Sequence, residues 1–290
     1  MACYAEWCAM TGVTEEQADG TCPTVVLLTR TDPANCYIAC QLAASRRLCL
    51  VAIVTEDRRR GQWQLLKKKI RRAWRQQRWR GVFTLGFAVP WLYWYDRRTV
   101  HLQQRTLWGH ARPQFPAGVR HEAFPSLNTD AVERLLHGLC PDFLLVSGTC
   151  LLEPRIFGRA KEGALNLHMG ITPEYRGSRG EFWALSRGDF QNVGLTVHRI
   201  DTGIDTGVIL LQRRLSVAPE DNERTLRIKN IQVAASLFEE AVVACTTGSL
   251  SAVESHGRVS RFFSTPMPWQ VWKMRCRRSW ARCRGKQGTS

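Results

Sequence analysis

The chain has 290 residues, of which 44% are apolar, and it holds 11 Trp and 11 Phe, so a sizeable core is expected and extensive disorder is excluded. Its formal net charge is +16, but two segments without acidic residues carry most of it: 58–80 holds 11 Lys or Arg and 273–286 holds 7. Without these two segments the net charge is −2. A nearly neutral body with two basic appendages is typical of an enzyme that acts on small molecules.

The N-terminal residues and the cysteines bear on cellular context. The first 20 residues lack a basic start followed by a long apolar run, so no signal peptide is predicted and a cytoplasmic protein is expected. The 11 cysteines are odd in number, scattered from Cys3 to Cys283, and include no CxxC pair. This pattern argues against a disulfide framework and against a zinc site. We expect reduced thiols and no bound metal.

The first half of the chain predicts a β-α-β start and then one more helix and strand. The predicted elements are a strand at 24–29, a helix near 34–46, a strand at 49–56, a helix capped by Asn128 or Thr129 that runs to Cys140, and a strand at 142–148. No element is predicted in the Pro- and Gly-containing stretch that ends near Pro125.

A basic insertion interrupts this half. Between Arg58 and Arg80, basic residues alternate with Trp, Leu and Ile, and the run GVFTLGFAVPWLYWY follows at 81–95. That run is too short to span a bilayer, and Pro90 interrupts it. A basic amphipathic helix followed by aromatic residues can lie on a membrane surface or bind a nucleic acid. It can equally be a solvated helical face that covers the core, and the three interpretations stay open.

The second half continues the alternation. The predicted elements are a strand at 164–170, a strand at 193–200, the turn DTGIDTG, a strand at 208–217, and a long amphipathic helix at 222–247 that Gly248 ends. We therefore predict an α/β fold: an open, mostly parallel, Rossmann-like sheet with helices on both faces, a helical basic insertion, and a small C-terminal helical and basic segment. The predicted divisions are an N-terminal extension (1–22), a main domain (23–217, with the insertion at about 57–120), and a C-terminal helix with a basic tail (218–290).

Three polar residues are the candidate chemical centre. Asn166 and His168 are two apart on a predicted strand, so both side chains point to one face. Aimed together at the end of a strand, an amide and an imidazole can stabilise an oxyanion on a carbonyl under attack. Asp205, in a tight Gly-flanked turn, can hold His168 in its charged form and help to remove a proton. Taken alone, an Asn-x-His pair is also what two ordinary hydrogen-bonded side chains look like. No P-loop or G-x-G-x-x-G sequence follows the first strand, so the usual cradle of a nucleotide cofactor is missing.

The order of the motifs resembles the formyltransferase family, which includes methionyl-tRNA, glycinamide-ribonucleotide and nucleotide-sugar formyltransferases. The matching pieces are Asn166-Leu-His168, the loop Met169-Gly-Ile-Thr-Pro173, Tyr175-Arg-Gly177, Phe182-Trp-Ala-Leu185 and Asp205-Thr-Gly207. The close match covers about fifty residues, and a looser one extends from Thr24 to about Val217. The resemblance implies that 23–217 is a catalytic domain in which Asn166, His168 and Asp205 are the catalytic residues.

The same resemblance implies the substrates. The donor would be 10-formyltetrahydrofolate, bound near Cys150, Leu151, Leu152 and Thr202, and no metal would take part. The acceptor would be a primary amine held near Tyr175, Arg176 and Gly177. Because the loop MGITP departs from the Ser-Leu-Leu-Pro type of the tRNA and purine enzymes, the acceptor stays open.

A nucleotide-linked amino sugar leads among the acceptors, since Arg176, Arg179 and Arg187 suit a phosphorylated amine. Three alternatives remain. The acceptor can be methionyl-tRNA, the chain can be a formyl-folate hydrolase, or it can be a non-catalytic or peripheral membrane protein with contact through 58–95. Nucleic acid is a less favoured partner, and the sequence does not predict the oligomeric state.

Overall fold

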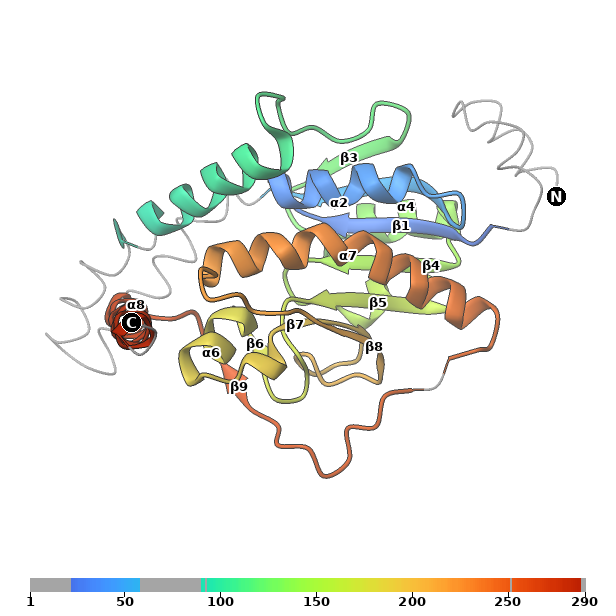
Figure 1. Ribbon diagram of the computed structural model, residues 1–290. Coiled ribbons are helices and arrows are strands. Elements are labelled where there is room, and N and C mark those ends of the chain that lie inside the picture. Colours follow the sequence, from blue (N-terminus) through green and yellow to red (C-terminus); the bar gives the residue numbers. More distant parts are fainter. Residues whose placement is uncertain (1–21, 58–89, 92, 251, 288–290) are drawn as a thin grey trace, which may run out of the picture.

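The computed structural model describes residues 22–57, 90–91, 93–250 and 252–287 (Figure 1). Most of the basic insertion, between Arg58 and Arg80 and on to residue 89, lies outside the described residues, and so do residues 1–21. The hypotheses about those segments stay predictions.

The main sheet of the described part has seven strands in the order β3-β2-β1-β4-β5-β7-β8. Their bounds are β1 Thr24–Thr29, β2 Cys49–Glu56, β3 Arg120–Phe124, β4 Phe143–Ser147, β5 Gly163–His168, β7 Gly194–Arg199 and β8 Ile209–Arg214. The strands from β3 to β5 pair in parallel, whereas β5–β7 and β7–β8 pair antiparallel. The predicted open and mostly parallel sheet is confirmed.

Helices cover both faces of this sheet, as predicted. Their bounds are α2 Pro33–Ala43, α4 Asp130–Leu139, α5 Pro154–Phe157, α6 Gly180–Arg187, α7 Glu223–Thr246 and α8 Pro268–Gln287, and an unlabelled helix runs over 93–108. α2 and α7 pack against each other and share one apolar core with the sheet, while α4 contributes to the core on the other face (Figure 1). α7 follows the predicted domain boundary at residue 217 but packs in the same core as the sheet. That boundary stays a prediction.

The local sequence explains where several of these elements begin and end. β1 and β2 are runs of apolar and β-branched residues, and almost every residue in them is buried, as in parallel strands covered on both faces. α4 begins where the Thr129 side chain accepts a hydrogen bond from the N–H of Val132. The other candidate cap, Asn128, instead donates to the carbonyl of Leu151.

Two elements of the structure were not predicted. β3 forms in the stretch before Pro125 where no strand was expected, because an edge strand of sequence RHEAF pairs through its backbone and buries little. The segment that contains Phe182 and Trp183 forms the helix α6, for which the sequence analysis predicted no element.

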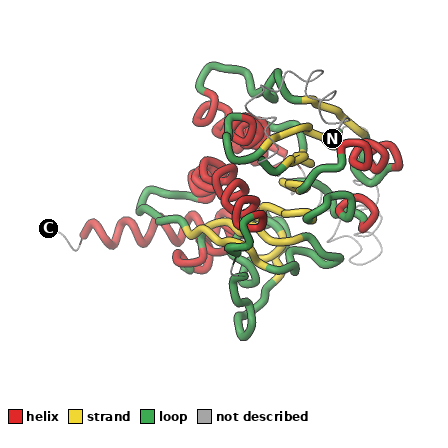
Figure 2. Tube along the Cα trace, turned by 90° about the vertical axis from the view of Figure 1, so that its right-hand side faces the viewer, coloured by secondary structure: helices red, strands yellow, loops and turns green. Residues whose placement is uncertain are grey.

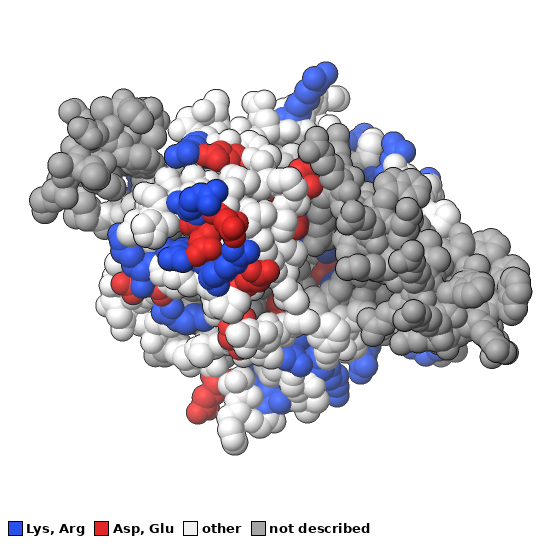
Figure 3. All heavy atoms as spheres, turned by 180° about the vertical axis from the view of Figure 1, so that it is seen from behind, with Lys and Arg blue, Asp and Glu red and all other residues white. Residues whose placement is uncertain are grey.

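The C-terminal segment packs beside the loop that follows β5. β9 (Phe262–Phe263) pairs with β6 (Arg176–Gly177), and the rings of Tyr175, Phe263 and Trp183 stack. α8 then projects away from the body (Figure 2). Across the described ranges, no helix has both the length and the apolar character to cross a bilayer. The back of the molecule shows basic and acidic side chains intermixed rather than one sign (Figure 3).

Candidate active site

A cavity of about 840 Å³ opens where the parallel strands end. Arg30 after β1, Gly148 after β4 and His168 at the end of β5 all line it, and the turn between β7 and β8 forms one wall. The volume lies within the usual range for small-molecule sites, and the carboxyl edge of an open α/β sheet is where such sites are found.

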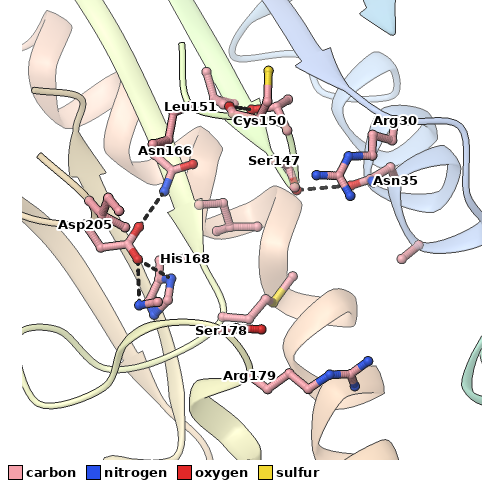
Figure 4. A pocket seen from close by; sticks show the side chains of 18 of the residues that line it. Arg30, Asn35, Ser147, Cys150, Leu151, Asn166, His168, Ser178, Arg179 and Asp205 are labelled. Carbon is pink, nitrogen blue, oxygen red and sulfur yellow. Dashed lines mark hydrogen bonds and ion pairs between the residues drawn. The ribbon is translucent and has the colours of Figure 1, made fainter. Parts of the chain in front are cut away.

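Asn166 and His168 reach this cavity because β5 alternates. Leu165 and Leu167 point into the core shared with α2 and α7, so the residues between and after them point to the other face. Both polar side chains line the cavity, as the spacing predicts (Figure 4).

Asp205 contacts both of these side chains. Its Oδ1 accepts from the Nδ2 of Asn166 at 3.3 Å, and its Oδ2 lies 3.3 Å from the Nδ1 of His168 (Figure 4). The backbone N–H of Gly177 also donates to Oδ2, at 2.8 Å. The structure therefore brings together the three residues that the sequence singled out, although their parts in catalysis remain a proposal.

The turn that carries Asp205 is held by its own residues. Asp201 accepts hydrogen bonds from the N–H of Gly203 at 3.0 Å and from the hydroxyl of Thr206 at 2.8 Å. A Cβ on Gly207 would lie 1.8 Å from the carbonyl oxygen of Arg199, so only glycine fits there. The repeated DTG thus has two parts: the first aspartate braces the turn, and the second faces the histidines.

Asp205 is a carboxylate at neutral pH. Burial by itself raises the pKa of Asp205, because a buried carboxylate loses hydration. The hydrogen bond from His198, the charge of His168 and the N–H of Gly177 outweigh burial and lower this pKa from its ordinary 3.8 to about 2. The ionised group can then accept hydrogen bonds from its neighbours throughout the physiological range.

His168 is buried, with 6% exposure, and both of its ring nitrogens face acceptors. Nε2 lies 2.6 Å from the carbonyl oxygen of Tyr175, and Nδ1 faces Asp205. Because a carbonyl and a carboxylate only accept, the two contacts are favourable together when the ring carries two protons. Gly170 makes room for this arrangement, since a Cβ there would lie 2.7 Å from both Nε2 and the Tyr175 oxygen.

His198 is a fourth member of the cluster, and the sequence analysis gave it no role. It lies on β7 opposite Asn166, with its Nε2 3.0 Å from the Asn166 amide and 3.4 Å from Asp205. Its Nδ1 lies 2.8 Å from the carbonyl oxygen of Arg199. In the sequence, His198 stands near the end of an alternating strand directly before the Asp205 turn, which places it near Asp205. Only the pairing of β5 with β7 shows that His198 lies opposite Asn166.

The other predicted site residues divide into two groups. Cys150, Leu151, Leu152, Thr202 and Gly177 line the cavity. Tyr175 and Arg176 are not among the described residues that do: the Tyr175 ring is 1% exposed and its hydroxyl donates to Asp189, and Arg176 donates to the carbonyl of Ile204 at 3.4 Å. Their part in binding an acceptor stays a prediction.

The cavity also contains charged residues far from Asp205. Arg30 and Arg179 lie across the cavity from it (Figure 4). Arg179 pairs with Asp96 of the 93–108 helix, and Arg227 of α7 pairs with the buried Glu181 at 2.9 Å. Arg187, by contrast, lies over the ring of Phe263. Only Arg179 among these cavity residues was considered from the sequence, because the others come from separate elements that share no motif.

No metal site is apparent in this part of the chain. Among the described residues, no group of three or more His, Cys, Asp or Glu side chains is placed to hold a metal ion. The cluster around Asp205 consists of the amide of Asn166, the imidazoles of His168 and His198, and the ionised carboxylate.

Comparisons with known proteins match the part of the chain that carries this cluster. Residues 114–242 match the protein-family model described as formyl transferase. The methionyl-tRNA formyltransferase of Thermodesulfovibrio yellowstonii is 34% identical over 135 residues, which are 46% of this chain and 44% of that protein. The matched part of the chain spans less than half the length of such curated relatives.

Solved structures share the fold. Glycinamide ribonucleotide transformylase 1 from Symbiobacterium toebii matches with a TM-score of 0.53 at 18% identity, over 85% of this chain and 96% of that one. A sugar N-formyltransferase from Shewanella sp. FDAARGOS_354 matches with a TM-score of 0.51 at 10% identity, over 83% of this chain and 76% of that one. The segment 114–242, with Asn166, His168 and Asp205 inside it, is a formyltransferase-family segment on the α/β fold of that family.

Proposed function

We propose that this chain transfers a formyl group from 10-formyltetrahydrofolate to the primary amine of a small acceptor. The observation that carries this proposal is the cluster at the cavity wall, in which the ionised Asp205 lies within 3.3 Å of both Asn166 and His168. An amide, a protonatable imidazole and a carboxylate at the edge of one cavity supply what an acyl transfer to an amine needs.

Each side chain has a distinct part in this chemistry. When bound, the folate supplies the formyl carbon, whose bond to the folate nitrogen breaks as the bond to the acceptor amine forms. The N–H groups of Asn166 and His168 would stabilise the negative charge that develops on the formyl oxygen. Asp205 orients the His168 ring through its contact with Nδ1 and would help to take the proton that the amine loses.

The contacts in the structure show what must rearrange. The Asn166 amide lies 3.0 Å from His198 and 3.3 Å from Asp205, and His168 donates to Tyr175. A carbonyl oxygen in the cavity would compete with these protein acceptors for the same N–H groups. Donors that are already oriented by buried partners lose little freedom when the substrate binds, which favours the transition state.

The cavity fits a flat folate ring on one side. Cys150, Leu151, Leu152 and Ile204 line it next to Asn166, and the Leu151 and Ile204 side chains are 65% and 40% exposed. Exposed apolar side chains at a cavity mouth are suited to cover the faces of a bound ring, while nearby backbone groups can bind its polar edge. These residues, together with Thr202, would hold the donor.

The acceptor side favours a small polar amine. The 93–108 helix closes the cavity with Asp96, Thr99 and Gln103, and Arg30 and Arg179 add positive charge. We therefore keep an amino sugar linked to a nucleotide as the leading acceptor, since guanidinium groups bind phosphates well. The curated relatives favour a second candidate, because those that match at 31–34% identity are methionyl-tRNA formyltransferases.

The test is the release of tetrahydrofolate from 10-formyltetrahydrofolate, measured with the purified full-length chain against amino-sugar nucleotides, glycinamide ribonucleotide and methionyl-tRNA. Asp205→Asn should lower kcat by roughly a hundredfold or more, as the loss of a preorganised electrostatic group does. Asp142→Asn is the matched control. This carboxylate also accepts from a backbone N–H, that of Thr24, but it lies directly before β4, at the amino ends of the parallel strands and away from the cavity.

The outcomes separate the candidates. Acceptor-dependent turnover with an amino sugar that collapses only in Asp205→Asn supports the proposal. Turnover with methionyl-tRNA alone assigns the second candidate, and formyl-folate loss without any acceptor assigns a hydrolase. If no acceptor supports turnover and the folate does not bind, the proposal is rejected in favour of a non-catalytic protein.

A further inference from the structure

α8 is bound to the body by one face. Val271 and Met274 are 1% and 3% exposed, and they pack in one apolar cluster with Tyr95 of the 93–108 helix. Arg275, on the same side, pairs with the buried Glu223, which also accepts from the Tyr95 hydroxyl at 2.9 Å. These contacts fix the orientation of α8, so its other face is presented in a defined way.

The outer face of α8 carries exposed indoles and cations. Trp269 and Trp272 are 55% and 70% exposed and lie about one helical turn apart. With 100° of rotation per residue, they point away from Val271, and Lys273 and Arg277 lie along their flank. α8 projects from the body (Figure 2), and all four of these side chains are exposed, so a large flat partner can reach them. We call these four residues the α8 outer face.

The neighbouring helix repeats the same composition. On the 93–108 helix, Tyr93 and Trp94 are 64% and 48% exposed. Arg97 lies over the Tyr93 ring at 5.7 Å, and Arg98 lies over the Trp94 ring at 4.0 Å. Two elements that contact each other through Tyr95 therefore both expose aromatic rings beside arginines.

The charge of α8 specifies the sign of its partner. The helix sequence PWQVWKMRCRRSWARCRGKQ contains no acidic residue, and 273–286 holds 7 Lys or Arg. Aromatic rings with an amphipathic character, flanked by Lys and Arg, are the residues that prefer the boundary between lipid headgroups and acyl chains. We propose that the α8 outer face binds the surface of a bilayer that contains anionic lipids.

A nucleic acid fits these observations less well. A single-stranded nucleic acid binds in a positively charged groove with aromatic faces free for stacking, whereas this face is the convex side of a helix. A helix that enters the major groove reads base edges with polar side chains, whereas two of the four side chains of this face are indoles. The indoles suit a headgroup layer into which they can insert.

This inference does not rest on the proposed formyl transfer, because the α8 outer face contributes no side chain to the cavity. Membrane binding would place the enzyme's body at a lipid surface without altering its chemistry. The two proposals can therefore fail separately.

The experiment is co-sedimentation of the purified full-length chain with vesicles of phosphatidylcholine alone and of phosphatidylcholine with phosphatidylserine. Trp269→Ser combined with Trp272→Ser removes the indoles, and Phe190→Ser, which changes a 48% exposed ring on another element, is the control. Lys273→Glu with Arg277→Glu reverses the charge, and Arg112→Glu with Arg134→Glu is a control with the same change in net charge. Circular dichroism and solution turnover check that all variants stay folded.

We expect binding to the phosphatidylserine vesicles only. Each basic side chain near an anionic surface strengthens binding by about fivefold, so the α8 charge variant should bind at least tenfold more weakly than its control, as should the indole variant. Equal binding to both vesicle types, or equal loss in the control variants, overturns the proposal. So does binding to tRNA in a gel shift, without vesicle binding, that the α8 variants abolish.

Discussion

The two halves of the main sheet use their side chains differently. In the parallel half, β1, β2 and β4 bury nearly every side chain, and all of these are apolar or small except Glu56 at the end of β2. In the antiparallel half, β7 and β8 carry His198, Gln212 and the Asp205 turn between them. β5 belongs to both halves, since it pairs in parallel with β4 and antiparallel with β7.

This difference shows where an α/β sheet can place buried polar chemistry. On β5, Leu165 and Leu167 complete the apolar core, while Asn166 and His168 meet partners supplied by β7 and its turn. Each of the four side chains Asn166, His168, His198 and Asp205 has a polar partner there, which a parallel strand covered by apolar helices would not supply. The parallel half provides rigidity, and the strand at the change of direction provides the site.

The largest effect should follow from opening a void in the parallel half. Phe143→Ala should lower the free energy of unfolding by about 3–5 kcal/mol, because the Phe143 ring is 1% exposed and its loss leaves a cavity. Urea unfolding measures this, with Phe190→Ala as an exposed control that should cost less than about 0.5 kcal/mol. Turnover per folded molecule should stay unchanged, and a variant that loses turnover but keeps its stability would contradict the division between the two halves.

At the site, crowding should affect rate more than stability. Gly170→Ala should lower kcat by roughly a hundredfold, about 3 kcal/mol, because the new Cβ displaces His168 from the Tyr175 carbonyl. Gly138→Ala is the control, since nothing lies within 4 Å of a Cβ at that α4 position and alanine favours a helix. Equal kcat for Gly170→Ala and the wild type would show that the position of His168 does not matter.

The charge at the site predicts a dependence of stability on pH. Asp205 has a folded-state pKa of about 2 against an ordinary value of 3.8, so its ionised form contributes about 2 kcal/mol. Because the folded-state value is the lower one, this contribution is complete above about pH 4 and is lost as the pH falls towards 2. The stability difference between wild type and Asp205→Asn, followed by thermal unfolding, should shrink over that range, and a constant difference would be inconsistent with an ionised Asp205.

The smallest effect concerns a purely local feature of the parallel half. Thr129→Ala should cost about 1 kcal/mol, because it removes the side-chain acceptor that caps α4. Thr129→Ser keeps an acceptor and should restore most of the loss in the same unfolding measurement. If serine does no better than alanine, packing and not capping explains the cost.

The sequence predicts the elements whose causes are local. β1 and β2 were predicted with the bounds that the structure has, because continuous β-branched and apolar runs flanked by polar residues specify buried strands. The cap of α4, Thr129, was one of two predicted candidates, because Asn and Thr before an apolar periodic run are local signals for the start of a helix. α6 was missed because the residue before it, Arg179, makes no side-chain cap, and the backbone of Gly180 is packed against Gly170 instead.

The sequence by itself determined which chemical groups are available: Asn166 and His168 on one face of a strand, an aspartate in a glycine-bounded turn, and their order along the chain. Only the tertiary structure decided that His198 completes the cluster, and that Arg30, Asp96 and Arg227 share its cavity. The reason is physical. Local patterns fix the direction of a side chain on its own strand or helix, whereas strand pairing and helix packing join residues such as Asn166 and His198, which lie 32 positions apart, and surround Asp205 with the groups that lower its pKa.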